Sequence, residues 1–151
     1  MQADAREVLD FWFGDAPAAR AEWFRKDPAF DAQIRERFGV LIEAVLAGAS
    51  FGDSAAERLA RIVVLDQFTR NIFRDTPRAF AGDAMALQAA RSLVARGFDR
   101  QLSPRRRGFA YLPFEHAEDL SVQAESLRHF GALAAEQPAL ADLLLWARKH
   151  Q

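Results

Sequence analysis

The stretch from Ser54 to Arg74 reads SAAERLARIVVLDQFTRNIFR and predicts both the fold class and a candidate site. It opens with a capping box, in which Ser54 and Glu57 bond each other's backbone at the start of a helix. Apolar residues then recur every three or four positions, as on the buried side of an amphipathic helix. At about 100° per residue, Asp66, Arg70 and Arg74 continue this apolar stripe. The pattern predicts a helix that turns charged side chains toward the core.

A second polar cluster, LPFEHAED, ends at Asp119 and is again set in apolar helical sequence. We expect one long helix over residues 113–135, with Glu115, Asp119 and Gln123 on its inward face. An unpaired charge is costly to bury, so such groups persist only where they satisfy one another or serve a ligand. We therefore predict that Arg70 lies within hydrogen-bond or one-water reach of Glu115 or Asp119.

Helical patterns recur from end to end, and the period-two pattern of strands is absent. The sequence predicts an all-α protein, a single domain over residues 1–151, built as an antiparallel array of seven to nine helices with no sheet. Its clearest helix begins at Asp27-Pro28 and ends near Gly48. A last helix begins at Pro138 and has no stop signal.

Composition narrows the classes of partner. The chain has 151 residues, of which 50% are hydrophobic and 27% charged, enough for one buried core. It has no cysteine, no basic, apolar leader at its first residues and no apolar run long enough to span a membrane, so we expect a soluble, cytoplasmic protein. Its net charge of −1 argues against nucleic acid or an anionic membrane as partner, and Arg105–Arg107 is the only basic run.

The first cluster carries side chains suited to binding. Arginine captures carboxylate or phosphate groups with two parallel hydrogen bonds, and amides both donate and accept. We predict ligand-binding roles for Asp66, Gln67, Arg70, Asn71 and Arg74, with Trp12 as a wall of the pocket. Two alternatives stay open: the charges pair across a helix contact and only lock it, and aromatic stripes are more often core than pocket.

The second cluster carries side chains suited to acid–base chemistry. Glu115 and Asp119 are one helical turn apart with an imidazole beside them, so we predict Glu115, His116 and Asp119 as catalytic residues. Alternatively, His116 is a core histidine bonded to a carboxylate. The order of the residues does not fit a di-iron Glu-x-x-His motif, no second histidine is near, and nucleotide-binding glycine motifs are absent, so we predict neither metal nor cofactor.

Three functions are compatible with these patterns. The first is an enzyme that binds a small polar or anionic molecule and catalyses hydrolysis or proton transfer, with Glu115 or His116 as base and Arg70 as anion clamp. The second is a scaffold whose superhelical groove binds a peptide or a partner helix. The third is a purely structural polar network.

Four motifs carry a resemblance to a known family: VLDFWFG at 8–14, WFRKD at 23–27, LDQFTRNIFR at 65–74 and YLPFEHAED at 111–119. Together they resemble the bacterial "domain of unknown function 924" family over almost the whole chain. The resemblance implies an all-α fold of the tetratricopeptide-like superfamily and no assigned activity.

Two departures from this family stand out. Thr69 occupies a position where the family usually has proline, so its backbone N–H is available. Family members also usually continue past His150 with a further helix and a basic, aromatic segment. We therefore expect either that residues after Gln151 are missing from this sequence or that the apolar edge they would cover is paired in a homo-oligomer.

Overall fold

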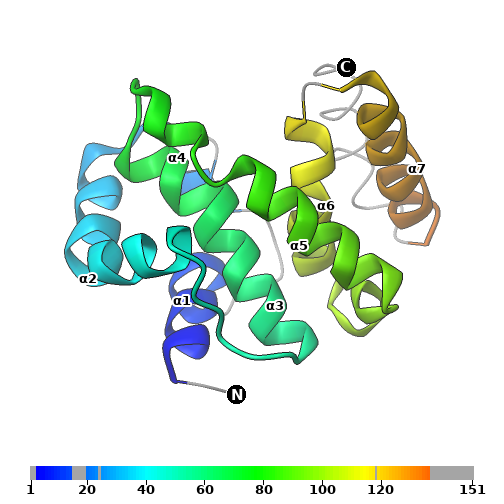
Figure 1. Ribbon diagram of the computed structural model, residues 1–151, viewed down its shortest axis with the longest axis horizontal. Helices are drawn as coiled ribbons and strands as arrows, with labels where there is room; N and C mark the ends of the chain where they lie inside the picture. The colour runs from blue at the N-terminus through cyan, green and yellow to red at the C-terminus, as the bar shows by residue number, and fades with distance from the viewer. Residues whose placement is uncertain (1–2, 15–19, 24, 118, 137–151) are drawn as a thin grey trace.

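One helical rod runs through the middle of the molecule and sets the places of the other helices (Figure 1). The structure is a computed structural model that describes residues 3–14, 20–23, 25–117 and 119–136. The rod consists of α3 (Ala55–Ile62), the π-helix η2 (Val63–Phe68) and α4 (Thr69–Ile72), which follow one another without a break. Its first part, α3, contacts α1 (Ala3–Phe13), α5 (Asp83–Ala95) and α6 (Pro104–His116), and its second half contacts α2 (Pro28–Leu46).

Of the other α-helices in the described ranges, four contact this rod, and the last one, α7 (Leu120–Glu136), packs against α6. Short 3-10 turns η1 (Ala21–Trp23), η3 (Pro77–Phe80) and η4 (Phe98–Gln101) lie between the helices. The described residues thus form six helical rods and no strand, which confirms the all-α prediction. The expected helix from Pro138 lies outside the described residues, so the count of seven to nine is not reached. None of the described helices is long and apolar enough to cross a membrane.

The sequence signals at two helix starts act as predicted. Ser54 Oγ accepts a hydrogen bond from the Glu57 N–H at 3.1 Å, and the Glu57 carboxylate accepts one from the Ser54 N–H at 3.3 Å. At the start of α2, the Asp27 carboxylate accepts from the N–H groups of the second and third helical residues, and proline occupies the first helical position. These bonds satisfy backbone donors that have no partner inside the helix.

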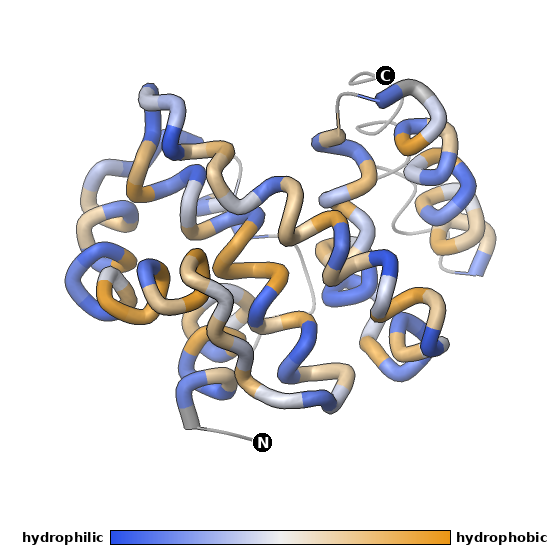
Figure 2. The backbone as a smooth tube through the Cα atoms, in the orientation of Figure 1, coloured by the Kyte–Doolittle hydropathy of each residue, from blue (hydrophilic) through white to orange (hydrophobic). Residues whose placement is uncertain are grey.

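The core is rich in aromatic side chains, and apolar stretches recur turn by turn along the helices (Figure 2). Trp12 is 1% exposed and stacks on Trp23 with ring centroids 6.1 Å apart. The rings of Phe68 and Phe109 meet Trp12 edge-on at 5.8 Å. Trp12, predicted as a pocket wall, therefore lies in the core.

The second polar cluster is not part of one long helix. Instead, α6 continues through Pro113 and ends at His116, and Ala117 is extended (φ −71°, ψ 142°). The Asp119 carboxylate then accepts hydrogen bonds from the N–H groups of Ser121 and, at 3.4 Å, of the next residue, at the start of α7. An aspartate that caps a new helix competes with helix continuation. The predicted shared face of Glu115, Asp119 and Gln123 is therefore wrong.

Candidate functional site

The first polar cluster begins inside the π-helix. The Thr69 N–H donates to the carbonyl of Val64, five residues back, and the Thr69 hydroxyl donates to the Leu65 carbonyl at 2.9 Å. The Asp66 carbonyl accepts from the Arg70 guanidinium at 2.6 Å. The side chains of Thr69 and Arg70 thus donate to backbone carbonyls within the π-helix. Single-turn π segments inside α-helices are frequent at functional sites.

The chain enters α5 in close contact with this π-helix. A Cβ atom at Gly82 would lie 2.3 Å from the Leu65 carbonyl oxygen, so only glycine fits without a shift of backbone. The next residue, Asp83, is thereby brought beside Arg70. Its carboxylate accepts two hydrogen bonds from the Arg70 guanidinium, at 2.8 and 3.0 Å.

The pair of Asp66 and His116 joins the two polar clusters. Asp66 is 1% exposed; its Oδ1 lies 2.8 Å from His116 Nδ1, and its Oδ2 accepts from the Gln67 amide at 2.6 Å. Burial opposes ionisation of Asp66, but His116 and Arg70 outweigh it and the pKa of Asp66 is lowered. Burial likewise opposes protonation of His116, but Asp66 outweighs it and the pKa of His116 is raised. The pair is therefore stabilised in its charged form.

Arg70 binds two other carboxylates. Its guanidinium donates to Asp83 and Asp66, and the predicted one-water reach of Glu115 or Asp119, which line the same cleft as Arg70, stays a prediction. The two clusters meet through His116, the last residue of α6, which contacts Asp66. Burial raises the pKa of Asp83, and Arg70 only partly offsets this effect.

A cleft of about 880 Å³ opens next to these groups. It lies between α5, the end of α6 and the start of α7, and Arg70, Phe80, Asp83, Ala84, Leu87, Arg91, Pro113, Glu115, His116, Ala117, Asp119, Ser121, Val122 and Gln123 line it. The three predicted catalytic residues are all in this lining. Glu115 is buried, the His116 side chain is 20% exposed, and Asp119 is exposed. Hydrogen bonds from Ser121 lower the pKa of Asp119, so it is a capping carboxylate in this structure.

The rest of the first cluster lies elsewhere. Asn71 donates to the Asp31 carboxylate at 2.8 Å, and Arg74 donates to the same carboxylate at 3.0 and 3.2 Å. Because α4 ends at Ile72, Arg74 is beyond the helix and does not follow its face. Asn71 and Arg74 therefore tie the rod to α2 and do not line the cleft.

Two acidic residues of these networks were not among the predicted site residues. Asp83 reads as a helix cap in the sequence, but it lies in the first turn of α5 and binds Arg70. Asp31 is buried and lies three residues before Ile34, on the apolar side of α2. A charge on an apolar stripe, the signal that identified Asp66, would have found Asp31 as well.

The described residues offer no metal centre. Among them, no three His, Asp or Glu side chains are grouped so that they could hold a metal ion. The charged and titratable groups at the site are the His116 imidazole, carboxylates and the Arg70 guanidinium. These groups can exchange protons and bind polar ligands.

Comparison with known proteins places the chain in a family. A family model described as "Bacterial protein of unknown function (DUF924)" matches residues 8–151. The chain belongs to the bacterial DUF924 family. Among solved structures, a protein of unknown function from Agrobacterium tumefaciens, ATU0120, is similar to this DUF924 chain, with 33% sequence identity and a TM-score of 0.77 over 97% of this chain and 79% of that one. No curated protein matches it.

The match confirms the resemblance found in the sequence. In this DUF924 chain, the motifs at 65–74 and 111–119 supply the two residues that meet as the buried pair, Asp66 and His116.

Proposed function

We propose that the cleft binds a small polar molecule and that His116, held by Asp66, exchanges a proton with it. One observation carries this proposal: an imidazole in the lining of the cleft has one ring nitrogen bonded to a fully buried carboxylate. A carboxylate in this position orients an imidazole and stabilises its charged form, as in hydrolase triads. The reaction class that fits is hydrolysis or another proton transfer.

The remaining lining residues receive supporting roles in this proposal. Because His116 Nδ1 is bonded to Asp66, Nε2 is the nitrogen that exchanges the proton. Glu115, adjacent to His116 in the lining, serves as a second acid–base group. Arg70 can clamp a ligand anion only if the anion displaces Asp83, whose raised pKa reflects an incompletely compensated charge. Phe80, 61% exposed, offers an apolar surface for a ring or alkyl group of the ligand.

A panel of activated esters, amides and phosphate esters tests the proposal. We expect His116→Gln to lower turnover by about 10²–10⁴-fold, the usual contribution of a general acid–base residue, while the thermal unfolding curve keeps its cooperativity. The matched control is His129→Gln, which removes an imidazole that stacks on Tyr111 outside the cleft lining. Equal turnover in His116→Gln and the wild type would contradict the proposal.

A binding scaffold is the second candidate function. The observation that favours it is the use of Asn71 and Arg74, two of the five predicted ligand-binding residues of the first cluster, in a structural tie to Asp31. In this view the cleft holds a peptide, as the predicted tetratricopeptide-like superhelix would. Binding of an extended peptide that His116→Gln leaves unchanged, with no turnover across the panel, would favour the scaffold over the enzyme.

We propose the cytoplasm as the location of this activity. A chain without cysteine needs no oxidising compartment. With a net charge of −1, we propose neither nucleic acid nor a membrane as its partner.

A further inference from the structure

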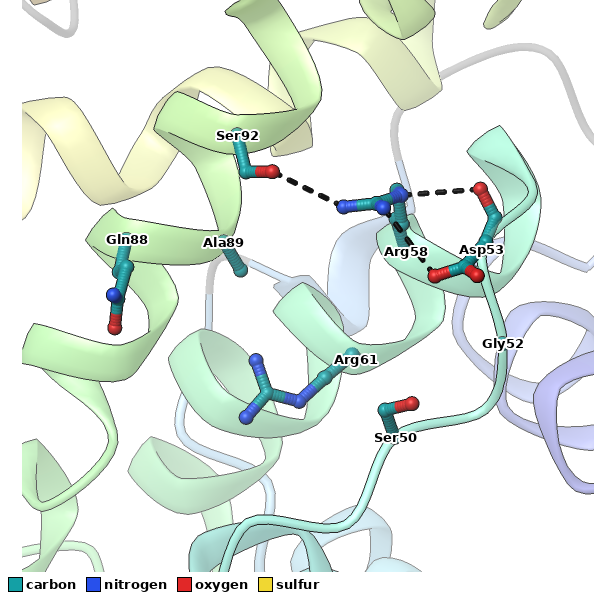
Figure 3. Close-up of a pocket in the computed structure, with 8 residues that line it drawn as sticks. All are labelled: Ser50, Gly52, Asp53, Arg58, Arg61, Gln88, Ala89 and Ser92. Atoms are coloured by element: carbon teal, nitrogen blue, oxygen red, sulfur yellow. Dashed lines mark hydrogen bonds and ion pairs between the residues drawn. The ribbon is translucent and has the colours of Figure 1, made fainter. Parts of the chain in front are cut away.

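A second pocket, of about 280 Å³, lies between α3, α5 and the loop that precedes α3 (Figure 3). Ser50, Gly52, Asp53, Arg58, Arg61, Gln88, Ala89 and Ser92 line it. It shares no lining residue with the cleft of His116. Its chemistry is therefore independent of the proposed acid–base site.

Arg58 uses each of its three guanidinium nitrogens in a hydrogen bond. Its guanidinium donates to the Ser92 hydroxyl at 3.2 Å and to the carbonyl and carboxylate of Asp53 at 3.0 and 3.3 Å. The Asp53 side chain is 92% exposed, so water screens this ion pair strongly.

Arg61 has donors to spare. Its Nε donates to the Ala49 carbonyl at 3.1 Å, and among the described residues it has no carboxylate partner. Figure 3 shows its guanidinium extending into the space between Gln88 and Ser50. Burial lowers the pKa of Arg61, as expected for a partly enclosed cation without a counter-ion.

The donors of this pocket come from three segments of chain and approach from different directions. Arg61 belongs to α3, Gln88 and Ser92 to α5, and Ser50 to the loop. The Ser92 oxygen accepts from Arg58, so its own proton is left to donate. Two guanidinium groups against one exposed carboxylate make the pocket positive. Non-coplanar donors suit the tetrahedral oxygens of phosphate, and arginine binds them in pairs.

We propose that this pocket binds a phosphate-type oxyanion, with Arg61 as its main ligand. Titration of the full chain with inorganic phosphate, at an ionic strength held constant with sodium chloride, tests this by amide chemical shifts. We expect saturable shifts in residues 49–61 and 88–92. Acetate, which is planar, should bind more weakly. Tighter binding of glycerol phosphate would support a phosphorylated metabolite as the source, and equal binding would support free phosphate.

Two variants separate the proposed contact from general charge effects. Arg61→Gln should weaken phosphate binding by about tenfold or more, because it removes charge-assisted hydrogen bonds. Gln88→Glu should also weaken phosphate binding, because it places a carboxylate where the anion binds while Arg61 is retained. Gln88 is exposed, so this variant should keep its fold. The control Arg6→Gln changes net charge equally, at an exposed position of α1.

Three results would overturn the proposal. The first is the absence of saturable shifts at the pocket in the wild type. The second is equal affinity in the wild type and in folded Gln88→Glu. The third is an equal loss in Arg6→Gln and Arg61→Gln, which would show attraction by net charge alone.

Discussion

Two buried carboxylates, Asp66 and Asp31, take part in networks built from one polar motif, but only the Asp66 network opens on the cleft. Asp66 contacts His116, which lines the cleft, and Arg70. Asp31 accepts hydrogen bonds from Asn71 and Arg74, across the contact between α2 and the rod. Similar side chains therefore form a candidate site in one place and a structural tie in the other. The difference is that His116, the partner of Asp66, lines the cleft, whereas Asn71 and Arg74, the partners of Asp31, do not.

The largest expected effect is the loss of the structural tie. Asp31→Ala should lower the free energy of unfolding by about 3 kcal/mol, because it leaves the buried Asn71 amide without its acceptor and Arg74 without its counter-ion. Chemical denaturation measures this loss. The pKa of His116, followed by NMR, should stay where it is in the wild type.

A control for Asp31→Ala lies on the same helix. Glu43→Ala removes an exposed partner of Arg78 and should cost about 0–1 kcal/mol. Similar losses in the two variants would show that the Asp31 network is no stronger than a surface ion pair. A shift in the pKa of His116 in Asp31→Ala would show that the two networks are coupled.

The next effect concerns the contact of α5 with the π-helix. Gly82→Ala should destabilise the protein by about 2 kcal/mol, because its Cβ would clash with the Leu65 carbonyl oxygen. It should also shift the amide resonances of the adjacent Asp83 and of Arg70, while those of Asp31 stay unchanged. Gly39→Ala is the opposite case: Gly39 lies inside α2 with no atom near a Cβ, so the change should stabilise by about 0.5–1 kcal/mol. If Gly82→Ala and Gly39→Ala changed the free energy of unfolding in the same direction, the proposed clash at Gly82 would be contradicted.

A third test addresses the charge of the Asp66 network. Asp66→Asn should lower the pKa of His116, because the charge of Asp66 outweighs the effect of burial in the wild type. The raised pKa of His116 stabilises the wild type fully below the ordinary value of 6.5, and this contribution is lost as the pH rises through the folded-state pKa. The wild type should therefore exceed Asp66→Asn in stability by more at pH 6 than at pH 9, with about 1.4 kcal/mol for each pKa unit.

At acid pH the stability contribution of Asp66 changes in the opposite direction, because it is lost as the pH falls. The pKa of Asp66 is lowered, so its contribution is present above its ordinary value of 3.8 and is lost as the pH falls through the folded-state pKa. The control is Asp119→Asn, which changes a carboxylate of the same cleft that caps α7 and should leave the pKa of His116 unchanged. An unchanged pKa of His116 in Asp66→Asn would remove the electrostatic link between the two clusters.

Local patterns predicted the parts of this structure that depend on local chemistry. The capping box of Ser54 and Glu57, the all-α fold and the inward direction of Asp66 all follow from residues within one or two helical turns. The pairing of Arg70 with Asp83 could not be read this way, because the chain first turns back through η3. The helix end at His116 and the capping of α7 by Asp119 were equally hidden, since we expected a helix to begin at Pro113, three residues before the observed end, and to continue through Asp119.

The π-helix is the feature that the sequence could least reveal. A projection at about 100° per residue assumes a regular α-helix; it gives the inward direction of Asp66 correctly, but it does not predict the wide turn of Val63–Phe68. The wide turn coincides with two side-chain bonds, from Thr69 and Arg70, and with the close approach of Gly82. The two side-chain bonds join residues four positions apart in the sequence, whereas Gly82 approaches the turn only because of the tertiary fold.

The smallest expected effect tests whether the Thr69 hydroxyl supports the wide turn. Thr69→Val keeps the branched shape of the buried side chain and removes its hydrogen bond to the Leu65 carbonyl, so we expect a loss of about 1 kcal/mol in the free energy of unfolding. Thr76→Val is the matched control, because the Thr76 hydroxyl donates to the Phe73 carbonyl at an exposed site, where water replaces it at lower cost. Denaturation curves of the two variants should therefore differ. Since Leu65 lies next to Asp66, a loosened turn should also shift the imidazole resonances of His116, and the Thr76 variant should leave them in place. If Thr69→Val is neutral and these resonances do not move, the wide turn is held by its backbone and by the contact with Gly82, and the hydroxyl has no part in positioning Asp66.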